Sequence, residues 1–181
     1  LYQRAGRWDA YADVLRKRIE LTGDDKTLVD LKYRLAGTLH EHLDDANGAL
    51  ENYREILFID ADHDGARVAL EGLLRNKSLQ NEAAAILENI YEARGDWDKL
   101  IAALEILAAG TEDGPRKVGL LRKIGSTAAL QLGQVDPAVD ALARAVREDP
   151  SNLDARQVLE RLAQRAKAWE RLVGMYGIVD A

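Results

Sequence analysis

One stretch of the sequence has the residue types and the spacing of a calcium-binding loop. Oxygen-bearing side chains follow the pattern Asp-x-Asp-x-Asp-Gly-x5-Glu, at Asp60, Asp62, Asp64, Gly65 and Glu71. This spacing lets hard oxygen ligands converge on one Ca²⁺ ion from a loop between two helices. Arg67 stands where such loops carry an apolar residue and would place a cation beside the ion. Two interpretations stay open: a calcium-responsive helical module, or a turn between helices in which Asp64 caps the next helix and Glu71 is exposed.

The histidines and tryptophans are weaker candidates for chemistry. His40 and His42 are two positions apart, which places them on different faces of a helix, so they cannot chelate one metal as a pair four apart could. We interpret them as surface or hydrogen-bonded histidines. Trp8, Trp97 and Trp169 stand at predicted helix starts with apolar residues one helical turn further on. We interpret them as packing side chains and not as an aromatic ligand box.

No arrangement typical of catalysis is evident in the sequence. It has no G-x-S-x-G motif and no phosphate-binding loop, and its carboxylates are scattered along polar helix faces. We therefore expect no enzyme activity, no cofactor and, outside the calcium-like loop, no metal site.

Composition and charge narrow the class of protein. The 181 residues are 47% hydrophobic and 31% charged, with three prolines and no cysteine, which is typical of a helical protein without disulfides. A net charge of −6 argues against nucleic acid as a partner. No apolar run approaches the roughly 18 residues of a membrane span, so we expect no membrane insertion. We expect a soluble protein, and we favour the cytoplasm over export. The compartment and the oligomeric state stay open.

The chain contains an internal repeat. Gly6-Arg7-Trp8-Asp9 returns as Gly95-Asp96-Trp97-Asp98, and the two copies stay in register without a gap at an offset of 89 positions. A period of this length is typical of repeat architectures. We therefore expect one repeat domain over residues 1–181, made of copies 1–89 and 90–178. Both ends of the chain align with the inside of a helix, so we also expect it to be a fragment of a longer repeat protein.

Apolar residues recur every three or four positions between short polar turns, which predicts helices throughout and no strands. Asp24, Ser78 and Gly23 are expected at helix ends, the first two as N-caps and Gly23 as a left-handed C-terminal residue. Short amphipathic helices must stack antiparallel on their sequence neighbours to bury their stripes. The predicted helices span residues 8–21, 27–43, 46–59, 65–75, 79–94, 97–109, 116–132, 135–148 and 152–165, with a last one from about 168.

Two motifs carry a resemblance to a known family. Gly133-x4-Ala138-x3-Leu142-x2-Ala145-x4-Pro150 and Tyr91-x3-Gly95-x-Trp97 are similar to parts of the tetratricopeptide repeat. The resemblance implies an all-α, tetratricopeptide-like superhelix, or solenoid, of about 10–11 antiparallel helices. The chain departs from the family in that its long repeat holds five helices where the family's unit holds two.

The resemblance also implies where a partner would bind. In tetratricopeptide-like arrays the first helix of each pair lines a concave groove. The matching positions here are Tyr33, Arg34, Asn89, Arg122, Lys123 and Ser126. We therefore predict a non-catalytic scaffold or adaptor that binds a protein or peptide segment in its groove. The basic members of this set suggest an acidic segment, and the alternative is a solvated helix face.

Overall fold

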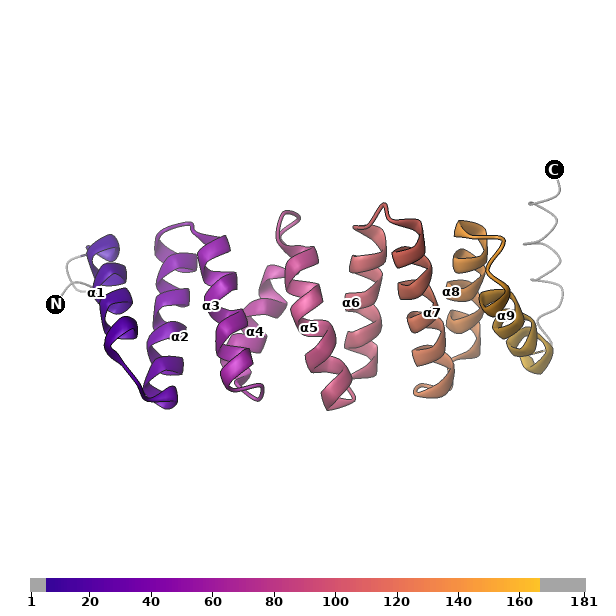
Figure 1. The fold of residues 1–181 in the computed structure, drawn as a ribbon, viewed down its shortest axis with the longest axis horizontal. Helices are drawn as coiled ribbons and strands as arrows, with labels where there is room; N and C mark the ends of the chain where they lie inside the picture. The colour runs from indigo at the N-terminus through magenta and orange to yellow at the C-terminus, as the bar shows by residue number, and fades with distance from the viewer. Residues whose placement is uncertain (1–5, 167–181) are drawn as a thin grey trace. The chain divides into compact units, whose positions relative to one another are not determined.

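The chain divides into two compact units that are both built of helices (Figure 1). The computed structural model describes residues 6–166, apart from the side chains of residues 163, 165 and 166. Unit 1, Leu1–Leu87, contains α1 (Trp8–Leu21), α2 (Asp25–His42), α3 (Ala46–Ile59) and α4 (Asp64–Leu73). Unit 2, Glu88–Ala181, contains α6 (Trp97–Ala109), α7 (Gly114–Leu130), α8 (Val135–Glu148) and α9 (Leu153–Ala166). Helix α5 (Gln80–Arg94) runs across the boundary between the units.

Within each unit, helices pack on their neighbours in sequence. Helix α1 packs on α2, α2 on α3 and α3 on α4, and the same order holds for α6, α7, α8 and α9 (Figure 1). No strand occurs in residues 6–166. The all-α fold and the stacking of consecutive helices are thus confirmed. The arrangement of both copies as one domain stays a prediction, and the helix expected from residue 168 lies outside the described residues.

The two copies share their buried positions. On α3 and α8, for example, Leu50 and Val139 are buried at equivalent places, as are Tyr53 and Leu142. Burying such side chains removes apolar surface from water, which is the main force that holds each helix on its neighbours. The repeat in the sequence therefore corresponds to a repeat of buried positions.

The copies also share the turn after their longest helices. The amide of Asp45 donates to the carbonyl of Leu39 at 2.9 Å, and the amide of Gln134 donates to that of Ala128 at 2.8 Å. A hydrogen bond from an amide to the carbonyl six positions earlier needs a left-handed residue just before the donor. Gly133 fills that position with φ 65°, whereas Asp44 fills it with φ 53°. Asp44 is the one non-glycine residue with positive φ in the described chain.

Asp44→Gly is therefore expected to raise the free energy of unfolding of unit 1 by about 0.5–1 kcal/mol. A side chain in the left-handed region strains the backbone, and Asp44 is exposed, so no buried contact is lost. Gly133→Ala is the matched opposite change and should lower stability by a similar amount. Urea denaturation followed by circular dichroism measures both. An unchanged or lowered stability for Asp44→Gly would show that the turn is not strained.

Three expectations about helix ends were wrong. Gly23 is not left-handed, because α1 ends in an extended residue, Thr22, and the next helix follows at once. Helix α2 is capped by Asp24, as predicted. The Asp24 carboxylate accepts a hydrogen bond from the amide of Thr27 at 2.8 Å. Ser78 does not begin α5. Its hydroxyl donates to the Asn76 side chain, and the helix begins at Gln80.

The third misplaced end is that of α4. His63, and not Asp64, caps this helix, since its Nδ1 accepts from the amide of Ala66 at 3.0 Å. An imidazole nitrogen can fill this role when the ring lies over the first turn, although histidine is not among the usual capping residues. Asp64 becomes the first helical residue.

Candidate functional site

The predicted partner-binding residues lie on three helices in two units. Tyr33 and Arg34 lie on α2 in unit 1. The other four belong to unit 2, and they are Asn89 on α5 and Arg122, Lys123 and Ser126 on α7. The set is therefore divided between the two units.

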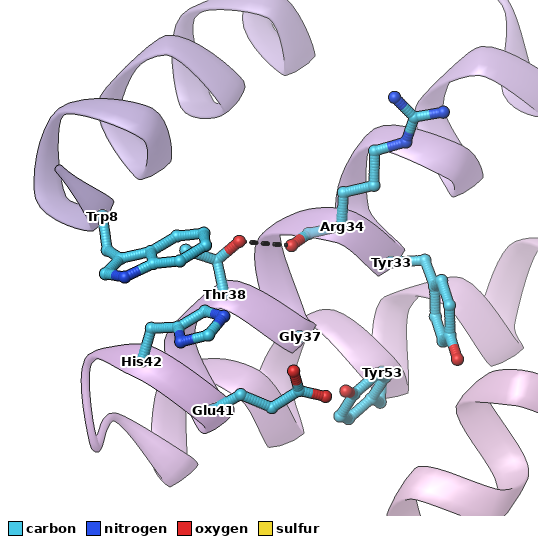
Figure 2. A pocket seen from close by; sticks show the side chains of 8 residues that line it. All are labelled: Trp8, Tyr33, Arg34, Gly37, Thr38, Glu41, His42 and Tyr53. Carbon is cyan, nitrogen blue, oxygen red and sulfur yellow. Dashed lines mark hydrogen bonds between the residues drawn. The ribbon is translucent and has the colours of Figure 1, made fainter. Parts of the chain in front are cut away.

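A pocket of about 250 Å³ lies in unit 1 and includes both predicted residues of that unit (Figure 2). Its lining comes from the start of α1, one face of α2 and one residue of α3. We call it the α2 pocket. It is lined by Trp8, Tyr33, Arg34, Gly37, Thr38, Glu41, His42 and Tyr53.

Aromatic rings form the walls of the α2 pocket. The indole of Trp8 stacks on the imidazole of His42, with ring centroids 3.6 Å apart and an interplanar angle of 7° (Figure 2). Tyr33 lies 6.1 Å from Tyr53, centroid to centroid, and 5.1 Å from His63. These contacts tie α1, α2, α3 and the start of α4 together, so the pocket is preformed when unit 1 is folded.

Glycine at position 65 lets Tyr33 reach the start of α4. A Cβ built on Gly65 would lie 2.8 Å from the hydroxyl oxygen of Tyr33, which is closer than two such atoms can approach. The Tyr33 ring thus lies against the backbone of α4. This contact holds the Tyr33 end of the pocket in place, which is the opposite end of the α2 lining from His42.

Two of the polar groups in the pocket are engaged within the chain. The guanidinium of Arg34 pairs with Asp30 one turn earlier on α2, at 2.8 Å. The hydroxyl of Thr38 donates to the backbone carbonyl of Arg34, also at 2.8 Å (Figure 2). The Thr38 hydroxyl therefore has no further proton to donate, and the charge of Arg34 is matched by that of Asp30.

Two further polar groups of the lining are not engaged. In residues 6–166, the Glu41 carboxylate forms no ion pair and the Tyr53 hydroxyl forms no hydrogen bond. Tyr53 is only 4% exposed, and its ring forms part of the pocket lining. Burial, with the nearby Tyr33 and the negative charge of Glu41, raises the pKa of Tyr53 to about 12. Its phenol therefore stays protonated at neutral pH and remains free to donate or accept.

This shifted pKa predicts a pH dependence of stability. Because the pKa of Tyr53 is raised above that of an unfolded chain, its contribution is fully present below about pH 10 and is lost as the pH rises toward about 12. Titration of phenolate absorbance in the near ultraviolet should show one tyrosine that ionises at a higher pH than the others. Tyr53→Phe should remove this late step. Equal phenolate formation per tyrosine in both proteins at about pH 11 would contradict the assignment.

The basic residues of unit 2 are neutralised within the chain. The ammonium of Lys123 lies 2.9 Å from Glu88 and 2.8 Å from Glu92 on α5. Desolvation lowers the pKa of Lys123, but the hydrogen bonds to the two glutamates outweigh it and leave that pKa raised. Arg122 approaches Asp154 of α9 at 3.7 Å. These pairs join α7 to α5 and to α9, so a free basic patch for an acidic segment finds no support.

The remaining predicted residues of unit 2 are exposed and polar. Asn89 is exposed on α5, and Ser126 is exposed on α7, where its hydroxyl donates to the carbonyl of Lys123 at 3.0 Å. No pocket among the described residues brings Asn89, Arg122 and Lys123 together. Their role in binding stays a prediction.

The calcium-like carboxylates are not assembled into a metal site. Arg67 pairs with Asp64 at 2.9 Å and with Glu71 at 2.7 Å, so its guanidinium occupies two of the four proposed ligands. The carboxylate of Asp60 accepts from the amide of Asp62, as in an ordinary turn. No group of three or more potential ligands that could hold a metal ion occurs in residues 6–166. The alternative of a calcium-responsive module at Asp60, Asp62, Asp64 and Glu71 is therefore not retained.

The α2 pocket contains residues that sequence reasoning assigned elsewhere. Trp8 was interpreted as a packing residue, and neither Tyr53 nor Glu41 was among the candidate residues. The signal that could have found them is helical spacing: Arg34, Thr38 and Glu41 follow one another at intervals of four and three, which is one face of a helix. Trp97 is half-buried at the start of α6, and Trp169 lies outside the described residues.

Comparison with known proteins agrees with the helical fold. The model of the tetratricopeptide repeat family matches residues 83–118, which cover most of α5, all of α6 and the first residues of α7. A comparison with curated proteins finds no match. In residues 6–166, no helix combines the length and the apolar character that a membrane span needs. With its consecutively packed helices, the chain is a tetratricopeptide-like helical repeat protein. Repeats of this kind are modules of protein-protein interaction.

Proposed function

We propose that the chain is a non-catalytic scaffold that binds a segment of a partner protein in the α2 pocket. The observation that supports this most directly is that Tyr33 and Arg34, which were predicted to bind a partner, both line the pocket. Trp8 and Tyr53 add aromatic surface beside them. Aromatic side chains offer large contact areas at a small cost in conformational entropy, which is why they dominate many binding surfaces.

The binding mechanism would rest on a rigid surface. Helices α1, α2 and α3 pack on one another, and the stacked rings of Trp8 and His42 close one side of the pocket. Because the surface is ordered before the partner arrives, most of the ordering entropy on binding falls on the partner's segment.

Gly37 allows a direct test, because it lines the pocket and a Cβ at this position meets no atom within 4 Å. Gly37→Gln should therefore fill part of the pocket without disturbing the fold. Glutamine is also the better helix former, by roughly 0.5–1 kcal/mol. The matched control is Gly119→Gln, since Gly119 lies in the interior of α7 and also faces open space.

The measurement is quantitative affinity capture from extracts of the source cells on wild type, Gly37→Gln and Gly119→Gln. We expect at least one protein to be retained by wild type and by Gly119→Gln, and to be reduced at least about tenfold on Gly37→Gln. Equal retention of every captured protein by all three would refute the α2 pocket as the binding site.

A further inference from the structure

The α2 pocket has an unbalanced negative charge. Of its charged groups, Arg34 is neutralised by Asp30, whereas Glu41 forms no ion pair with a described residue. The Glu41 carboxylate lies close enough to Tyr53 to influence the titration of its phenol. Figure 2 shows this carboxylate on the same side of the pocket as the Tyr53 hydroxyl. The groups left for a ligand thus include a carboxylate and a neutral phenol.

The hydroxyl of Tyr53 is open to the α2 pocket. It forms no hydrogen bond in residues 6–166, and although Tyr53 as a whole is only 4% exposed, its hydroxyl oxygen is not among the fully buried unpaired atoms of these residues. The hydroxyl faces the pocket and can accept a hydrogen bond from a donor placed there. A ligand donor between Tyr53 and Glu41 would satisfy both.

The walls of the pocket favour a cation over a neutral donor. The faces of tyrosine and tryptophan rings attract a cation through their quadrupole. Trp8, Tyr33 and Tyr53 all line the pocket, and the stack with His42 covers one face of the Trp8 indole. The whole chain carries a net charge of −6, which adds a long-range attraction for a basic partner.

We infer that the α2 pocket binds an arginine side chain of the partner segment, between the Glu41 carboxylate, the Tyr53 hydroxyl and the aromatic walls. This inference rests on the proposed function and names the chemistry of its ligand. The planar guanidinium has several donors and stacks on aromatic rings, so it suits the pocket better than the compact ammonium of lysine. This is the opposite of the acidic segment that the basic residues suggested in the sequence.

Short peptides test the inference on the intact chain. The probes are acetyl-Gly-X-Gly-amide peptides in which X is arginine, lysine, glutamate or leucine. The readout is nuclear magnetic resonance of the Trp8 indole N–H, assigned with Trp8→Phe, together with the backbone amides of Gly37 and Thr38. We expect the arginine peptide to shift these signals at the lowest concentration, the lysine peptide to follow more weakly, and added salt to weaken both.

Glu41→Gln removes the negative charge of the pocket and keeps the shape of the side chain. It should lower the affinity for the arginine peptide about fivefold, the effect of losing a solvent-exposed ion pair. The control is Glu20→Gln, because Glu20 is exposed on α1 outside the pocket and its loss changes the net charge equally. Wild-type affinity is expected for that control.

The outcomes distinguish this inference from the proposed function. Equal binding of the glutamate or leucine peptide at the same signals, or unchanged arginine binding by Glu41→Gln, would overturn the arginine inference and keep the pocket as a peptide site. No shift of the Trp8, Gly37 or Thr38 signals by any of the four peptides at millimolar concentration would overturn both.

Discussion

Gly125→Ala is expected to destabilise unit 2 by about 1–3 kcal/mol, although alanine is normally the better helix former. Helices α7 and α8 approach each other at Gly125. A Cβ there would lie 2.8 Å from Cγ of Leu142 and 3.2 Å from the backbone carbonyl oxygen of Ala138. The equivalent residue of the first copy is Ala36, which is fully buried. The first copy therefore accommodates a Cβ at this position of its longest helix, whereas the second copy does not.

Gly119→Ala is the matched control on the same helix. A Cβ at Gly119 meets no atom within 4 Å, so the substitution should raise stability by up to about 1 kcal/mol. Urea denaturation followed by circular dichroism measures both variants, and amide hydrogen exchange of α7 and α8 assigns the change to unit 2. Stabilisation of the same size by both substitutions would show that α7 and α8 do not meet closely at Gly125.

Leu142→Ala should have the largest effect, a loss of about 2–5 kcal/mol in the free energy of unfolding. Leu142 is 1% exposed on α8, so its truncation removes buried apolar contacts and leaves a cavity at the contact with α7. Leu130→Ala makes the same chemical change on α7 at a side chain that is 77% exposed. It should alter stability by no more than about 0.5 kcal/mol. Comparable losses in the two variants would mean that Leu142 is not in the core.

The two large effects should not add. The smaller side chain in Leu142→Ala leaves room for the new Cβ of Gly125→Ala, so the double variant should lose less than the sum of the single losses. A double-mutant cycle from the same denaturation curves gives the coupling free energy. Strict additivity would place the two residues out of contact.

Helix positions could be predicted from the sequence where the turn chemistry is ordinary. The predicted bounds of α1, α3, α6 and α8 agree with the structure at both ends. The starts of α2, α4, α5, α7 and α9 differ from the predicted ones by one or two residues. Two of these starts have unusual chemistry: a histidine caps α4, and the side chains of Ser78 and Asn76 bond to each other before α5. Propensity ranks residues by their average behaviour, and these ends depend on one particular side-chain geometry.

The site was harder to predict than the fold, because its chemistry depends on pairs that are far apart in sequence. Lys123 looked free in the sequence, but it is neutralised by Glu88, 35 positions away on α5. Glu41 was not a candidate from the sequence, but packing brings its charge near the phenol of Tyr53 on another helix. Helical spacing shows which residues share a face, and only tertiary packing shows which charges remain unpaired.

Site-specific photo-crosslinking shows whether a partner segment binds in the α2 pocket. The photoreactive residue p-benzoylphenylalanine replaces Tyr33, which lines the α2 pocket, and in a separate variant it replaces Phe58, which is 92% exposed on α3 and does not line it. If the pocket binds a partner segment, irradiation in the source cells gives a crosslinked protein from position 33 that position 58 does not give. Equal yields of the same product from both positions, or no product from position 33, would contradict the account.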